Sequence, residues 1–366
     1  MNNKREGNYD LLRIVACIAV VMIHVATYFY QEYAKLGAAE ITSQNQLISI
    51  ALYYTIPRFA VPCFVMLSGA FVLDQKRTED YKQFYKHTFE KVGIPTLVFS
   101  ALYMIYGFLL ATLRNDPDFN PGGINGRYAD VWIKALKGEP FYHMWYLFMM
   151  IGVYLLAPVI YRFIKNCDQT ALNKIAVFFL ILASISYWTS SSMLKWDIGR
   201  SFEYCSYFLI GYCIRKSSQS DKKKAAIGII GGVSAELIST WFSYLQLTHA
   251  ADFHLEIVEP LTPFTVIASV PFFWGFAHLR FNRDVSGLSS ETFYIYLFHA
   301  GILDVIVKIL NKINGKNYLT QVNSAYMIPL LVIIVFLLAW LFSVIYQHIT
   351  QLLKLYRIKA NTGNKE

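Results

Sequence analysis

Charged residues are scarce in this sequence, since only 16% of its 366 positions carry Asp, Glu, Lys or Arg. Soluble globular proteins have about 25% charged residues. Hydrophobic residues instead make up 55% of the chain, and the mean hydropathy is +0.38. The apolar residues come in runs of roughly twenty, the helix length that crosses the roughly 30 Å hydrocarbon layer of a bilayer. The composition therefore excludes an ordinary soluble protein and predicts an all-α, polytopic membrane protein.

Several motifs of soluble enzymes are also missing. The sequence has no GxSxG elbow, no HExxH zinc motif, no P-loop and no cluster of Cys and His. The five cysteines form no CxxC pair, and most lie in apolar runs, as buried thiols do. We therefore expect no bound metal and no permanently bound cofactor. No Gly/Ser linker divides the chain, so a single domain over residues 1–366 is expected.

About ten apolar runs are candidates for transmembrane helices. They lie at about 11–30, 46–73, 91–113, 143–164, 173–192, 202–214, 225–245, 262–281, 291–312 and 324–348. The sixth is short. The second contains Pro57 and Pro62, so a kink is expected in it. It ends near Ser68-Gly69, where small residues predict that helices approach closely.

Lys and Arg are unequally divided between alternate loops. With the N-terminus inside, the inner segments hold 21 of these residues and the outer segments hold 10. The side with the excess is the cytoplasmic side. Both termini are therefore expected in the cytoplasm, which requires an even number of spans. The same bias explains the net charge of +9, so we expect no nucleic-acid partner.

The first apolar run contains two ionisable residues, Arg13 and His24, although such residues cost about 2.5–3.5 kcal/mol within a span. They are eleven positions apart, about 20° beyond three full turns of an α-helix. They therefore share one face, about 16 Å apart along the axis. In a purely structural alternative, Arg13 extends to the inner interface and His24 bonds a neighbouring helix.

Further polar residues fall in or beside later spans. Arg58 lies too deep in the second span to reach water easily, so it needs a cavity or a partner such as a structural ion pair. His143 and Trp145 open the fourth span at the outer interface, where an aromatic belt is also expected. His299 lies in the ninth span, where a bond between helices is the alternative.

Two carboxylic acids, Glu236 and Asp304, also lie within spans, and the sequence assigns them no role.

Together these residues resemble the integral membrane acyltransferase family 3. The most specific mark of that family is an Arg followed eleven residues later by a His in the first helix, here Arg13 and His24, preceded by Asp10-Leu11-Leu12. Residues 58–69 resemble its Arg…Pro-x-Phe-x-x-x-Ser-Gly stretch, 143–147 its His-x-Trp-aromatic-Leu entry to a helix, and 294–299 its Tyr-x-x-His motif. The resemblance covers about 8–348, which leaves 349–366 as an expected cytoplasmic tail. It matches the stand-alone form, without a soluble esterase-like domain.

The resemblance implies an O-acyltransferase in a bacterial-type plasma membrane. Its co-substrate would be a cytoplasmic acyl-CoA, usually acetyl-CoA, and its acceptor a hydroxyl of a surface sugar or polysaccharide. His24 would be the general base, since an imidazole with a pKa of about 6.5 can take the hydroxyl proton. Arg13 would orient the donor thioester or stabilise developing negative charge.

The resemblance also suggests binding residues. Arg58, His143, Trp145 and His299 would line the tunnel or the acceptor side. The basic cluster Lys82, Lys86 and Lys91 would attract the CoA phosphates, although each lysine also fits an ordinary inner loop. The expected partners are thus acyl-CoA, a sugar acceptor and membrane lipid, and the oligomeric state is not visible in the sequence.

Two other functions fit the same residues. A transporter or flippase for a polysaccharide or lipid-linked sugar would also use intramembrane Arg and His. A membrane partner that binds acyl groups without catalysis is the third possibility. The shared face of Arg13 and His24, and the lack of a visible internal repeat, favour the enzyme.

Overall fold

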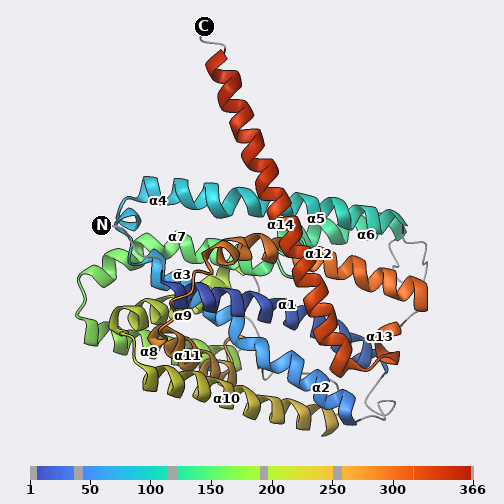
Figure 1. Ribbon diagram of the computed structural model, residues 1–366, viewed down its shortest axis with the longest axis horizontal. Helices are drawn as coiled ribbons and strands as arrows, with labels where there is room; N and C mark the ends of the chain where they lie inside the picture. The colour runs from blue at the N-terminus through green and yellow to red at the C-terminus, as the bar shows by residue number, and fades with distance from the viewer. Residues whose placement is uncertain are drawn as a thin grey trace. The chain divides into compact units, whose positions relative to one another are not determined.

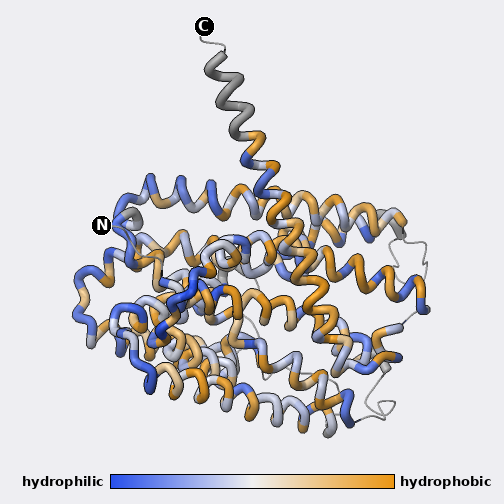
Figure 2. The backbone as a smooth tube through the Cα atoms, viewed as in Figure 1, coloured by the Kyte–Doolittle hydropathy of each residue, from blue (hydrophilic) through white to orange (hydrophobic). Residues whose placement is uncertain are grey.

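The computed structural model of the chain confirms the all-α class (Figure 1). It describes residues 6–36, 44–113, 123–189, 197–249, 258–315 and 317–363. No strand occurs within these ranges. Hydrophobic residues dominate long stretches of helix, such as α5 (Ile94–Leu113), whereas the preceding α4 (Tyr81–Thr88) is largely hydrophilic (Figure 2).

Eight helical segments of the described chain are long and apolar enough to cross a membrane, so the chain is a multi-pass membrane protein. They are Gly7–Ala34, Gln44–Val72, Tyr81–Leu113, Trp145–Lys165, Gln169–Tyr187, Lys222–Thr248, Ser286–Asn314 and Ser324–Leu353.

Two of the ten predicted spans fall short of these criteria. The run at 262–281 corresponds to α11 (Pro263–His278), whose 16 residues are fewer than the roughly 20 that a bilayer requires. The run at 202–214 lies in α9 (Asp197–Ser217), which carries charged residues near both ends.

The helices pack into two compact units. Unit 1 comprises Met1–Cys63, Ser220–Pro260 and Ile267–Glu366, and unit 2 comprises Phe64–Gln219 and Leu261–Val266. Each unit combines segments that are distant in the sequence. The single domain over 1–366 stays a prediction.

In unit 1, α1 packs against α2, α12 and α14, and α10 packs against α2 (Figure 1). The helices are α1 (Gly7–Leu36), α2 (Gln44–Thr55), α10 (Lys222–His249), most of α11, α12 (Ser286–Asn314), α13 (Tyr318–Gln321) and α14 (Ser324–Gly363). After Gly7, α1 contains neither Gly nor Pro, which explains why it runs unbroken for 30 residues. Its buried side chains, including Val25 and Phe29, join Ile50, Leu303 and Leu331 in one hydrophobic core.

The expected kink in the second span is confirmed. After α2, the chain tightens into a 3₁₀ turn, η2 (Ile56–Phe59), and then continues as α3 (Ala60–Val72). Pro57 lies at the start of this turn. Because proline has no backbone N–H, a regular α-helix through this position would lose one of its hydrogen bonds. Arg58 therefore projects from a turn between two helices, not from a regular helix.

Unit 2 contains most of α3 and the helices that follow it up to α9. Its elements are η3 (Lys76–Glu79), α4, the π-turn η4 (Phe89–Gly93), α5, α6 (Gly123–Leu136), α7 (Trp145–Lys165), α8 (Gln169–Thr189) and α9. The close approach predicted at Ser68-Gly69 is confirmed. A Cβ at Gly69 would lie 1.7 Å from the Phe208 carbonyl oxygen, and one at Gly211 would lie 2.0 Å from that of Met66. Glycine at both positions lets the α3 and α9 backbones touch.

An ionic cluster beyond the end of α3 strengthens this packing. The Asp74 carboxylate pairs with Arg215 at 2.7 Å and with Lys216 at 2.5 Å. Arg215 also donates to the Ala70 carbonyl oxygen at 3.1 Å. Burial alone would raise the pKa of the Asp74 carboxyl, but the hydrogen bonds from Lys216 and Arg215 outweigh it and hold that pKa below its ordinary value.

Candidate active site

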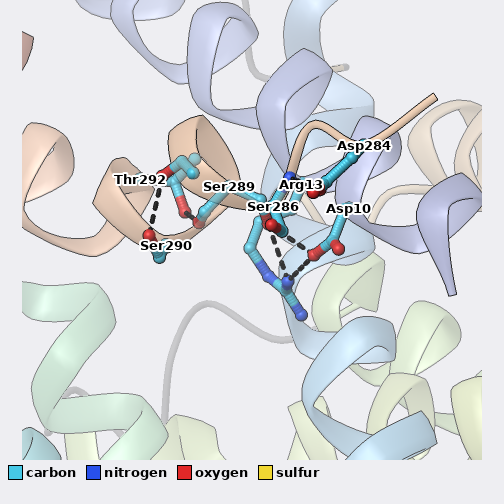
Figure 3. Close-up of polar contacts among 8 residues, drawn as sticks. Asp10, Arg13, Asp284, Ser286, Ser289, Ser290 and Thr292 are labelled. Atoms are coloured by element: carbon cyan, nitrogen blue, oxygen red, sulfur yellow. Dashed lines mark hydrogen bonds and ion pairs between the residues drawn. The ribbon is translucent and has the colours of Figure 1, made fainter. Parts of the chain in front are cut away.

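Arg13 is held near the start of α1 by two partners (Figure 3). Its Nη1 donates to Asp10 Oδ1 at 2.9 Å and to Ser289 Oγ at 3.0 Å. Ser289 Oγ in turn donates to Asp10 Oδ1 at 2.6 Å, which closes a triangle of hydrogen bonds between α1 and α12. The Arg13 side chain is 28% exposed, whereas that of Asp10 is 5% exposed. The guanidinium is thus fixed from its buried side.

His24 lies further along α1, beside a second histidine. Its ring and that of His299 on α12 have centroids 5.1 Å apart, with planes tilted by 35°. His299 Nδ1 is 2.6 Å from the Tyr296 carbonyl oxygen. Because a carbonyl oxygen only accepts, Nδ1 carries a hydrogen, and a neutral His299 ring presents Nε2 as an acceptor. The pair therefore offers both donor and acceptor nitrogens.

Arg58 is a cation within electrostatic reach of His24. Its Nε donates to the Tyr54 carbonyl oxygen at 3.1 Å, and the guanidinium carbon lies 3.9 Å from the centre of the Tyr54 ring. Its Nη1 is 3.8 Å from the Glu259 carboxylate. The sequence required a partner for this deep arginine, and the structure supplies one in Glu259.

Glu236 on α10 is a second carboxylate within electrostatic reach of Arg58. It is 3% exposed. It also lines a cavity of about 30 Å³ whose other walls are apolar, among them Phe59 and Phe272. A carboxyl group this deeply buried keeps a negative charge only with a cation near it, and Arg58 is within electrostatic reach.

His143 and Trp145 belong to unit 2. His143 is buried at the start of α7, with its ring 5.2 Å from that of Tyr103 and 5.8 Å from that of Phe141. Trp145 is partly buried, and the Arg200 guanidinium lies 5.9 Å from its ring centre. These contacts form an aromatic cluster, as expected at the entry to that span.

The three lysines of the predicted cluster also belong to unit 2, and all three side chains are exposed. Lys82 and Lys86 are one turn apart on α4, and Lys91 lies in the π-turn before α5. The exposed ammonium groups are accessible to an anionic ligand or to lipid head groups.

The structure thus brings His24, His299 and Arg58 together in unit 1, with Arg13 eleven residues before His24 on the same unbroken helix. Sequence reasoning missed Ser289 and Glu259 and left Glu236 without a role. Ser and Glu are common, and nothing in their local sequence marks a contact with a distant helix. Asp10 could have been found, because a carboxylate three residues before an arginine lies on the same helix face.

Of three comparisons with known proteins, one finds a match. No curated protein and no solved structure matches the chain. The model of acyltransferase family 3, described as an acyltransferase domain, matches residues 6–344, nearly the whole chain. With its multi-pass helices and the Arg13 and His24 helix, the chain belongs to acyltransferase family 3 and is a membrane acyltransferase.

Proposed function

We propose that this acyltransferase moves an acetyl group from cytoplasmic acetyl-CoA to a hydroxyl of a cell-surface sugar or polysaccharide precursor, in a bacterial plasma membrane. One observation carries the proposal: the His24 ring lies 5.1 Å from that of His299, with Arg58 close by, on the helix that also holds Arg13. His24 can take up a proton, and the cations Arg13 and Arg58 lie in the same unit. These groups suit a reaction in which the acyl donor and the acceptor hydroxyl meet near His24.

His24 acts as the general base. A sugar hydroxyl is a poor nucleophile until its proton is removed, and a positioned imidazole typically accelerates such a step by about 10²–10⁴-fold. As His24 takes the proton, the hydroxyl oxygen forms a bond to the acetyl carbonyl carbon and the carbon–sulfur bond breaks. The proton then passes to the departing thiolate, which leaves as free CoA.

The other residues bind and orient the two substrates. Arg13 orients the donor thioester or stabilises the negative charge that develops on its oxygen. The exposed Lys82, Lys86 and Lys91 attract the CoA phosphates from the cytoplasmic side. Arg58 and His299 line the acceptor side around His24. We also assign substrate binding to His143 and Trp145 of unit 2.

His24→Ala tests the proposal. We expect acetyl transfer to fall by at least about 10²-fold, because the general base is lost. Membranes of cells that express each variant are incubated with radiolabelled acetyl-CoA, and label in the polysaccharide fraction is counted. His348→Ala, at an exposed histidine of α14, is the control and should retain wild-type transfer.

Normal transfer by His24→Ala would remove this residue from the mechanism. Wild-type membranes that transfer no label, yet move the lipid-linked sugar across the bilayer, would point to a transporter instead.

A further inference from the structure

The Arg13 guanidinium bonds both Asp10 and Ser289 through one nitrogen, Nη1. Figure 3 shows the other terminal nitrogen of the guanidinium pointing away from these two partners. A guanidinium is planar, so two bonds at one nitrogen fix the direction of the whole group. The contacts therefore set where the charge of Arg13 points.

Ser289 completes the arrangement from a different helix. Its hydroxyl accepts from Arg13 and donates to Asp10, so it bonds both members of the ion pair at once. It is 2% exposed, and its backbone N–H is bonded to the Val285 carbonyl oxygen at the start of α12. A rigid helix thus presents the hydroxyl, whereas Arg13 itself stays partly accessible.

We propose that Asp10 and Ser289 are positioning residues, which hold the Arg13 guanidinium in the direction that binds the acyl donor. This inference rests on the proposed function for its readout with acetyl-CoA. Neither residue touches the donor. Both act through Arg13. A charged side chain with several rotatable bonds takes up many orientations when the partners that hold it are removed.

The chain offers a matched pair of variants for the test. Ser289→Ala removes the hydroxyl that bonds Arg13, while Ser290→Ala removes a neighbouring hydroxyl that bonds the Gly287 carbonyl oxygen of its own helix. We expect Ser289→Ala to raise the KM for acetyl-CoA about 3- to 10-fold, the range for one lost hydrogen bond of ordinary strength. The Ser290→Ala variant should match the wild type.

A double-mutant cycle separates positioning from general damage. If Ser289 acts through Arg13, then Ser289→Ala should have no further effect on kcat/KM in an Arg13→Gln background. Ser289→Thr, which keeps the hydroxyl, should restore most of the donor affinity. Additive effects of the two substitutions, or equal KM values for Ser289→Ala and Ser290→Ala, would overturn the inference.

A second measurement needs no donor. Phenylglyoxal labels accessible arginines, and peptide mass spectrometry of the purified protein in lipid nanodiscs gives the rate at Arg13. Labelling of Arg13 should be faster in Ser289→Ala than in Ser290→Ala, and equal rates would contradict the inference. If wild-type protein transfers no acetyl group from acetyl-CoA, the proposed function fails, and the labelling rates alone decide the role of Ser289.

Discussion

At the scale of single residues, the charges inside unit 1 are arranged as compensated sets. Arg13 is paired with Asp10, and Arg58 is paired with the more exposed Glu259 and lies within electrostatic reach of the buried Glu236. An uncompensated charge in a low-dielectric interior costs several kcal/mol, so each cation needs its carboxylate. Charge balance therefore stabilises the same residues that we assign to the reaction.

The Arg58 and Glu236 pair gives a stability prediction. Arg58→Gln removes a cation within electrostatic reach of the buried Glu236, so any negative charge on that carboxyl group loses its compensation. The double variant Arg58→Gln with Glu236→Gln removes both charges, so we expect it to melt at a higher temperature than Arg58→Gln alone. Thermal unfolding in detergent, followed by intrinsic fluorescence, measures the difference.

Glu259→Gln is the control for this comparison. The side chain of Glu259 is 38% exposed, and pairs at accessible sites contribute about 0–1 kcal/mol, so its melting temperature should change little. A double variant that melts no higher than Arg58→Gln would show that Glu236 does not depend on Arg58.

At the scale of helices, unit 2 depends on glycines that let backbones touch. The packing of α3 on α9 leaves no room for a side chain at Gly69 or Gly211, because the atoms that a Cβ would meet belong to the backbone. Backbone atoms cannot rotate away as a flexible side chain can, so an added methyl group must separate the helices.

Gly69→Ala should therefore destabilise the protein by about 1–3 kcal/mol, the usual cost of overpacking. The matched control is Gly231→Ala on α10, where an added Cβ would have no atom within 4 Å. That control should be neutral, or more stable by up to about 1 kcal/mol, because Ala favours helix over Gly. Thermal melting of both variants in detergent makes the test, and equal melting temperatures would contradict the packing argument.

At the scale of the whole molecule, the number of membrane crossings depends on whether α9 and α11 each cross the membrane. The ten-span prediction requires α9 to cross the membrane, although its charged residues keep it below the criteria that eight other segments meet. The cluster Lys222, Lys223 and Lys224 follows α9 directly, and such clusters remain on the cytoplasmic side.

Reporter fusions decide whether α9 crosses. With ten spans, green fluorescent protein fused after Ser220 should fluoresce, because this position lies in the cytoplasm. Alkaline phosphatase fused after Gly138, in the turn between α6 and α7, should be active, because that position lies outside. Active phosphatase after Ser220 would instead mean that α9 does not cross.

The regular parts of the fold could be predicted without the structure. Eight of the ten apolar runs correspond to helices long enough to cross a membrane, because span length depends only on local hydrophobicity. The break at Pro57 followed from the missing N–H of proline. Two runs differ. The run at 202–214 is short and lies in a helix with charged residues near both ends, and the helix within 262–281 covers only 16 residues.

By itself, the sequence determined the membrane class, the family and the shared face of Arg13 and His24, because helical periodicity and hydrophobic length are local properties. Only the tertiary structure decided which residues meet them. His299 and Ser289 come from a helix more than 250 positions away, and Glu236, which lies within electrostatic reach of Arg58, comes from a third helix. Such contacts depend on how whole helices pack, and no local pattern in a single sequence specifies that packing.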